Sequence, residues 1–234
     1  MRGYGLRAET VDCGALYETI RADFVAMLRT LRVDQLEGRV AATPEWRVRD
    51  VVAHLAGLTE DLNRAYFGDG DPDAWTQVQV DRFRDSSLEE IIQAWDQEAP
   101  AFEEGLQLFG YQVGNHFVGD LFIHVTDVRS ALGLAVDRES VAMWTTLDWY
   151  LDALDVSLRE HGDGALEAMT VPEQRVVGTG TVVATVAAPA FEIARACAGR
   201  WSAGQIAAFA WTGDASKFLP LISQYSTPSE DLAD

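Results

Sequence analysis

The stretch Gly119–Gly133, GDLFIHVTDVRSALG, decides how the middle of the chain folds. Its apolar residues recur at the three- and four-residue steps of an amphipathic helix, and Gly133 is typical of the position just after a helix end. The same stretch carries Asp120 and His124, one helical turn apart, and His116 lies one turn before Asp120. We therefore predict a helix over about residues 115–132 that aligns three metal-competent side chains on one face.

Amphipathic helices are also predicted on both sides of this stretch. Their apolar residues place them at residues 12–32, 47–67, 87–106 and 138–160. Ser87 with Glu90 three positions later is a typical helix start, and Pro100 is expected to kink or break the helix that follows. We expect a loop around Gly38 and a solvated acidic turn at residues 67–75, FGDGDPDAW.

The sequence pattern changes after His161. Residues 165–189, ALEAMTVPEQRVVGTGTVVATVAAP, are rich in Val and Thr and contain Pro172 and two glycines, which predicts two short strands with a turn. Two short helices should follow, then a strand around residues 209–211 and a last helix or docking segment over residues 214–225. The predicted fold class is α+β, with a bundle of four or five helices over residues 1–160 and a small α+β domain over residues 161–234.

Composition limits the classes of partner. The 234 residues carry a net charge of −19 and no basic stripe, which argues against nucleic acid and anionic membranes. No apolar run is long enough to span a bilayer, and the N-terminus lacks a signal-peptide core, so we expect a cytoplasmic protein. Cys13 and Cys197 form no CxxC pair and are expected to be free thiols. All cationic residues except Lys217 are Arg, which indicates a GC-rich genome.

The second predicted helix carries a further candidate ligand. His54, in RDVVAHLAG, lies on the same side as the core residues of its helix. If the two helices are neighbours, His54 could converge with Asp120 and His124, and two imidazoles with one carboxylate suit zinc, nickel or iron. The alternative is that these are ordinary core residues and a helix-surface pair. His116 could be a third or fourth ligand, whereas His161 is expected to be a surface cation at a helix end.

Three motifs resemble one known family. Residues 43–57, TPEWRVRDVVAHLAG, resemble the signature of the mycothiol-dependent maleylpyruvate isomerase family, part of the DinB-like bundle superfamily. Residues 119–133 resemble its later helix, and residues 195–214, RACAGRWSAGQIAAFAWTGD, resemble its C-terminal domain, which is related in shape to sterol carrier proteins. The motifs occur in the expected order and span nearly the whole chain.

The resemblance implies a divalent metal, most commonly zinc, held by His54, Asp120 and His124. It also implies mycothiol as cosubstrate, an actinobacterial origin, and deprotonation of the thiol by the metal. Arg200 would be a catalytic clamp for an anionic group, or alternatively part of a salt bridge. The chain departs from the family at Asp120, where the isomerase has Glu, and at Arg47, where the family has Ser or Thr.

These features predict a metal-dependent enzyme that activates mycothiol or a similar thiol for transfer to, or isomerisation of, an electrophilic small molecule. Two alternatives stay open: a non-catalytic binding protein with a vestigial site, and a hydrolase that uses metal-bound water. His116 discriminates between them, because a fourth protein ligand would close the site. The expected partners are the small-molecule substrate and the thiol, and the protein is expected to be a monomer or a homodimer.

Overall fold

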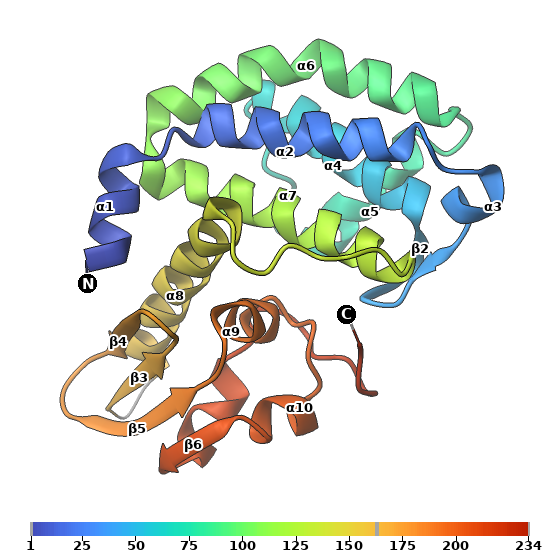
Figure 1. The fold of residues 1–234 in the computed structure, drawn as a ribbon. Helices are drawn as coiled ribbons and strands as arrows, with labels where there is room; N and C mark the ends of the chain where they lie inside the picture. Colours follow the sequence, from blue (N-terminus) through green and yellow to red (C-terminus); the bar gives the residue numbers. More distant parts are fainter. Residues whose placement is uncertain (1, 162–163, 234) are drawn as a thin grey trace. The chain divides into compact units, whose positions relative to one another are not determined.

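The structure is a computed structural model that describes residues 2–161 and 164–233 (Figure 1). The helices are α1 (Arg2–Thr10), α2 (Cys13–Leu28), α3 (Val33–Leu36), α4 (Val48–Asn63), α5 (Pro72–Arg82), α6 (Leu88–Phe109), α7 (Tyr111–Ala131), α8 (Val141–His161), α9 (Ala190–Cys197) and α10 (Ala203–Ala207). The strands are β1 (Arg39–Val40), β2 (Thr43–Arg47), β3 (Ala165–Met169), β4 (Gln174–Gly178), β5 (Val182–Ala187) and β6 (Ala210–Gly213).

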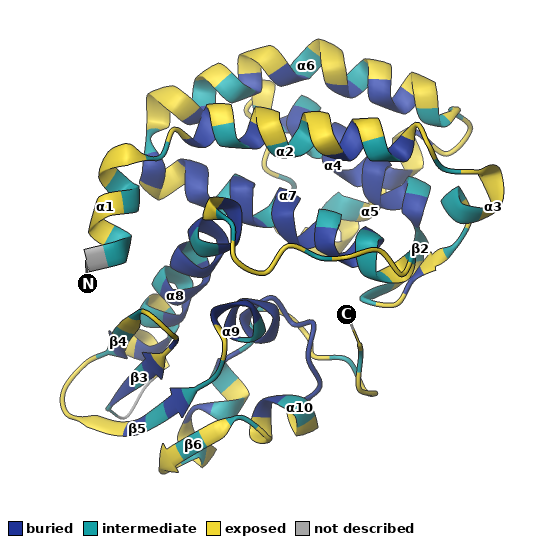
Figure 2. Cartoon of the chain, in the orientation of Figure 1, coloured by how far each residue is buried: buried dark blue, intermediate teal, exposed yellow. Residues whose placement is uncertain are grey.

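Contacts divide the chain into two compact units. One contains residues 12–117 and 124–135, and the other contains residues 118–123 and 136–233 with α1. The first unit is a helical bundle in which α6 packs along α2 and α4, and α5 packs on α4. Figure 2 shows buried faces on these helices, while the outward sides of α2 and α6 are exposed. The largest fully buried side chains of this unit include Phe24, Leu28, Leu55, Ile91, Ile92 and Trp95.

Helix α6 begins as predicted but does not end as predicted. Ser87 Oγ accepts a hydrogen bond from the Glu90 amide at 3.3 Å, and the Glu90 carboxylate accepts one from the Ser87 amide at 2.7 Å. The helix then runs unbroken through Pro100, so of the two predicted effects of this proline, a kink or a break, the break is wrong. A proline inside a helix costs about 3 kcal/mol. The apolar face continues on both sides of it, with Trp95 and Phe102 buried, and this packing offsets the lost hydrogen bond.

The start of α4 shows how the chain replaces the usual Ser or Thr cap. Arg47 is the N-cap residue, and its backbone amide donates to Asp50 Oδ2 at 2.9 Å. The Arg47 guanidinium also holds this carboxylate, at 2.8 and 2.9 Å. Burial would raise the pKa of Asp50, but the hydrogen bonds from Arg47 outweigh it and the pKa is lowered. The cap that Ser or Thr would supply is therefore replaced by an ion pair within the first turn.

Two elements of the first unit differ from the sequence prediction. The expected loop before α4 contains an antiparallel strand pair, β1 with β2, in which Val40 faces Thr43 and is fully buried. The expected acidic turn leads into α5, which was not predicted. Asp71 caps α5 by accepting from the amides of Asp73 and Ala74, and Pro72 occupies its first turn.

The second unit contains a mixed four-stranded sheet in the order β4-β3-β5-β6. β3 pairs antiparallel with β4 and parallel with β5, and β6 closes the other edge antiparallel to β5. Three strands therefore occupy the segment for which two were predicted, because Gly178 and Gly180 adopt the positive φ of a tight turn and β5 follows them. α8 packs against β4 and α9.

The end of the second unit is less helical than predicted. Residues 214–225 contain two short 3-10 turns, η1 (Ala215–Lys217) and η2 (Leu219–Leu221), instead of a last helix. The α+β fold class is confirmed, whereas the domain boundary at residues 160/161 stays a prediction. Among the residues that the structure describes, no helix is both long and apolar enough to cross a membrane.

Candidate metal centre

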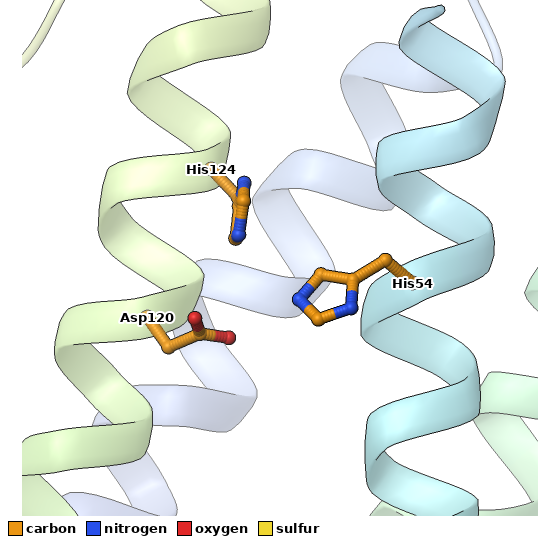
Figure 3. A group of neighbouring side chains, drawn as sticks. All are labelled: His54, Asp120 and His124. Carbon is orange, nitrogen blue, oxygen red and sulfur yellow. The ribbon is translucent and has the colours of Figure 1, made fainter. Parts of the chain in front are cut away.

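Helices α4 and α7 bring the three predicted ligands together. His54 lies on α4, and Asp120 and His124 lie one turn apart on α7. One ligand atom from each residue lies within 4.8 Å of the other two. Figure 3 shows both rings and the carboxylate directed toward a common space, with one nitrogen of His54 facing the other two residues. His54 is 4% exposed and His124 is 7% exposed, so both imidazoles are buried, whereas Asp120 is partly exposed.

The geometry fits a divalent transition metal. Three atoms that lie within 4.8 Å of one another always share a point about 2.8 Å or less from each of them. Zinc binds imidazole nitrogen and carboxylate oxygen at about 2.0–2.2 Å, so an inward shift of about 0.7 Å per side chain would complete a site. Small rotations about side-chain bonds supply such a shift. Two imidazoles and one carboxylate are also a usual donor set for zinc and iron.

A buried chain of hydrogen bonds orients His54. Its Nδ1 lies 2.8 Å from Gln79 Oε1, and Gln79 Nε2 donates to Asp61 Oδ2 at 3.0 Å. Because the Gln79 amide nitrogen is committed to Asp61, its oxygen must accept, and His54 therefore carries its proton on Nδ1. Nε2 is then the nitrogen that carries the lone pair needed to bind a metal ion. Metal-binding histidines are commonly fixed in this way by an acceptor on the second ring nitrogen.

Asp61 lies at the far end of this series of hydrogen bonds and holds it in place. It is 4% exposed and accepts from Trp75 Nε1 at 2.8 Å and from Arg82 Nη2 at 2.6 Å. Three donors therefore stabilise one buried carboxylate, which in turn fixes the amide of Gln79. Gln79 itself has no exposed surface, so its orientation is determined by these two neighbours.

Aromatic and acidic groups surround the two imidazoles. The ring of Trp46 lies 5.1 Å from that of His54 and 6.0 Å from that of His124, tilted to both. The two imidazole rings are 4.9 Å apart at 70°. The buried carboxylate of Asp127 lies 3.8 Å from His124 Nδ1. Trp46 thus covers one side of both histidines, and the Asp127 carboxylate places a negative charge near Nδ1 of His124.

The other two histidines lie outside the cluster. Among the described residues, the one group able to hold a metal contains His54, Asp120 and His124 without His116. The His116 ring instead stacks on Phe117, with centroids 4.8 Å apart. His161 is exposed at the end of α8, with Nδ1 3.1 Å from the Ser157 carbonyl, which agrees with the surface role predicted for it. Three protein ligands leave a coordination position open, as in catalytic rather than structural zinc sites.

Arg200, the predicted clamp, is almost buried. It is 9% exposed and follows the C-terminal turn of α9, where Nη1 donates to the Ala198 carbonyl at 2.7 Å. Its charge and that of Asp120 both act on the hydroxyl groups of Tyr150 and Tyr225. Burial raises the pKa of both phenols, and Tyr225 reaches about 12.

Sequence reasoning did not identify three residues of this region. Gln79 lies on the helix that was not predicted, Trp46 was recognised only as a motif position, and Tyr225 was assigned to a terminal segment. The signal that could have located α5 is Asp71-Pro72, a capping residue followed by proline at the first helical position.

Comparison with known proteins identifies similar chains. Residues 17–110 match the family described as mycothiol maleylpyruvate isomerase N-terminal domain, a match that includes His54 and ends just before α7. Two solved structures are similar, a mycothiol-dependent maleylpyruvate isomerase and a histidine-to-alanine mutant of it. They are 12% and 11% identical, both with a TM-score of 0.56 over 80% of this chain and 88% of theirs. A search of curated proteins gives no match.

Proposed function

We propose, from the match of residues 17–110 to the mycothiol maleylpyruvate isomerase N-terminal domain, that His54, Asp120 and His124 hold a divalent metal ion that activates a small thiol. Zinc is the metal we favour and mycothiol the thiol. The single observation that carries the proposal is the convergence of these three ligand atoms within 4.8 Å in a nearly buried space. A bound divalent cation would lower the pKa of a coordinated thiol, so that thiolate is available at neutral pH.

The protein residues have separate roles in this proposal. His54 binds through Nε2, and Gln79 keeps its proton on Nδ1, where it cannot compete with binding. Trp46 covers one side of the rings of His54 and His124. His116 lies outside the ligand group, which supports a site with an open position for the thiol.

Arg200 would hold the anionic end of the substrate or of the thiol conjugate. A guanidinium presents paired N–H donors that match a carboxylate, and a site from which water is largely excluded strengthens that interaction. The bond to the Ala198 carbonyl orients the side chain before any ligand arrives. The substrate would be an electrophilic small molecule, and the product either its thiol conjugate or its isomer.

Asp120 bears on the choice of substrate. It is one methylene shorter than the Glu of the isomerases that the chain resembles, so a metal held here would lie closer to α7. A displacement of about 1 Å can cost on the order of 100-fold in rate. We therefore propose that the preferred electrophile differs from maleylpyruvate. The small thiol and the buried free cysteines both suit a reducing cytoplasm, where we place the protein.

The test is a thiol titration of the cobalt-substituted protein followed by absorption spectroscopy. Mycothiol, with cysteine as a general probe, should produce a new thiolate-to-metal charge-transfer band. His54→Ala should lose the band and most of the bound cobalt, whereas His161→Ala, which changes an exposed histidine, should behave as wild type.

The other outcomes separate the alternatives. Bound cobalt with no spectral response to either thiol would refute thiol activation. Hydrolysis of an activated ester by that protein would then favour metal-bound water as the nucleophile. Unchanged cobalt content in His54→Ala would refute the ligand assignment itself.

A further inference from the structure

A small cavity is formed by the strand pair β1–β2 together with helix α5 and the start of α4. Its volume is about 240 Å³, and all of its lining residues belong to the helical unit. At about 30 Å³ per water molecule, this space corresponds to about eight waters. It therefore suits a ligand of about the size of one amino acid rather than a larger cofactor.

The strand pair presents a charged face to this cavity. Arg39 and Arg47 are partners across β1 and β2, and Glu45 lies two residues before Arg47. Because side chains two residues apart in a strand lie on the same face, these three lining residues share one face of the pair. From α5 the cavity is lined by Val80, which is 8% exposed. The cavity thus combines charged groups from the strands with an apolar contact from the helix.

Two of the three arginines that line the cavity are paired with carboxylates that also line it. Arg47 Nε and Nη2 donate to Asp50 at 2.8 and 2.9 Å, and its Nη1 donates to Glu37 at 2.7 Å. Arg84 Nη2 donates to Asp81 at 2.6 Å. The charges of Arg47, Arg84 and both aspartates are therefore compensated within the protein.

Arg39 and Glu45 are the two charged groups of the cavity that form no ion pair with the described residues. Arg39 Nη1 donates to the main-chain carbonyls of Pro44 and Glu45, which leaves N–H groups on Nε and Nη2 without an acceptor in the described chain. The Glu45 carboxylate accepts no hydrogen bond from residues 2–161 or 164–233. Both residues are exposed, so a ligand can reach them from solvent.

Trp46 adds a second apolar contact to the cavity. Its ring lies against the imidazoles of His54 and His124, with centroids 5.1 and 6.0 Å apart, and this contact holds the ring in place. Trp46 is only partly exposed and, with Val80, borders the cavity. One guanidinium with available donors, one available carboxylate and two apolar side chains match a molecule that carries a carboxylate, an ammonium group and a hydrocarbon part.

We propose that this cavity binds a free amino acid with an apolar side chain. Arg39 binds its carboxylate, Glu45 binds its ammonium group, and Trp46 and Val80 contact its hydrocarbon part. A ligand with a single charge would leave either Arg39 or Glu45 uncompensated. None of the three candidate metal ligands lines the cavity, so the proposal does not depend on metal binding or on thiol chemistry.

The first test is a titration of the purified full chain with L-leucine and two analogues, followed by ligand-observed NMR. 3-Methylbutylamine lacks the carboxylate of leucine, and 4-methylpentanoate lacks its ammonium group. L-Leucine should bind with a Kd on the order of 0.1–1 mM, as expected of a ligand of this size. Each analogue should bind about 10-fold more weakly, because it loses one charged hydrogen-bond partner. No binding of leucine, or equal affinities for the three ligands, would overturn the proposal.

Two variants separate the roles of the charged residues. Glu45→Gln should weaken leucine binding about 10-fold but should not weaken binding of 4-methylpentanoate, which has no ammonium group. Arg39→Gln should weaken binding of leucine and of 4-methylpentanoate but not of 3-methylbutylamine. If Glu45→Gln left leucine binding unchanged while Arg39→Gln weakened it, the cavity would bind any small carboxylate and the proposal would be wrong.

Glu104→Gln and Arg32→Gln are the matched controls. Glu104 is an exposed residue of α6, Arg32 is an exposed arginine paired with Asp34, and neither lines the cavity. Both variants should bind leucine as wild type does, and losses equal to those of the cavity variants would refute the assignment. Since the Glu45 carboxylate has no partner among the described residues, Glu45→Gln should leave urea unfolding unchanged and its binding data can be interpreted directly.

Tryptophan fluorescence locates the bound ligand. Leucine should change the emission of wild type, and Trp46→Phe should lose this change although the other tryptophans of the chain remain. A change that persists in Trp46→Phe would place leucine at another site and overturn the proposal. No change in wild type would refute the contact with Trp46.

Discussion

Replacing Gln79 with methionine should weaken metal binding without unfolding the protein. The substitution keeps a side chain of similar length but removes both the acceptor of His54 Nδ1 and the donor to Asp61. His54 then loses the contact that selects its Nδ1–H tautomer and fixes its ring. Asp61 keeps its bonds to Trp75 and Arg82, so the buried carboxylate is not left without donors.

The magnitude follows from the position of Gln79 behind the ligand. Removing the hydrogen-bond partner of a metal-binding histidine typically lowers metal affinity 10- to 100-fold. That range corresponds to about 1.4–2.7 kcal/mol of binding free energy. The unfolding free energy of the metal-free protein should fall by about 1–3 kcal/mol, because one buried N–H of His54 loses its acceptor.

The assay is competition for zinc with a chromophoric chelator, combined with urea unfolding of the metal-free protein. Gln77→Met is the matched control, since Gln77 lies on the same helix, is exposed, and donates to Asp81 at 3.0 Å. It should change zinc affinity by less than about twofold. A Gln79→Met affinity equal to that of this control would refute the inference that the Gln79 amide orients His54.

Three further outcomes are expected. Gly57→Ala should lower the unfolding free energy, measured in urea, by about 1–3 kcal/mol, because the new Cβ would lie 2.7 Å from a side-chain carbon on α5. This clash should outweigh the better helix propensity of Ala. An increase in the unfolding free energy would show that α5 can move away. Asp50→Asn should cost about 1–2 kcal/mol at pH 7. The hydrogen bonds from Arg47 lower the pKa of Asp50 in the folded state. The stability that the ionised carboxylate contributes is therefore fully present above its unfolded pKa near 4 and is lost as the pH falls through its folded pKa. A cost of Asp50→Asn that stays constant from pH 7 to pH 2 would contradict the argument. Gly199→Ala should lower the melting temperature, because Gly199 has a φ of +71° and the added methyl would lie 2.9 Å from the backbone oxygen of Ser226. Calorimetry checks it, and an unchanged melting temperature would show that the close approach at Gly199 is not required.

The sequence predicted the helices that supply the candidate ligands but not the helix that supports them. α4 and α7 have apolar faces with a clear helical repeat, so their positions and the alignment of Asp120 with His124 could be read from spacing. α5 buries only Gln79 and Val80 and is otherwise polar, so it has no apolar repeat to recognise. Its stability comes from its cap and from contacts with α4, which depend on the tertiary structure.

The same reasoning explains the other differences. Pro100 is a helix breaker by local propensity, and only the buried faces of α6 on either side of it keep the helix continuous. β1 is two residues long, too short for any alternation to appear in the sequence. The convergence of His54 with the α7 pair was a conditional prediction, because no spacing rule gives the distance between helices that are far apart in the chain.

The split of the candidate ligands, two on one helix and one on another, has a consequence for which ion the scaffold would accept. Asp120 and His124 lie on one helix, so their mutual spacing changes little when the protein fluctuates. His54 lies on another helix, so its distance from this pair can change. The distance from this pair to His54 depends on the position of α4, and the close contact of Gly57 with Gln79 holds α4 against α5. The size of the ion that fits would therefore depend on the packing of α4 against α5. Laboratory evolution toward a larger ion should accumulate substitutions along the α4–α5 contact before it changes any of the three ligands.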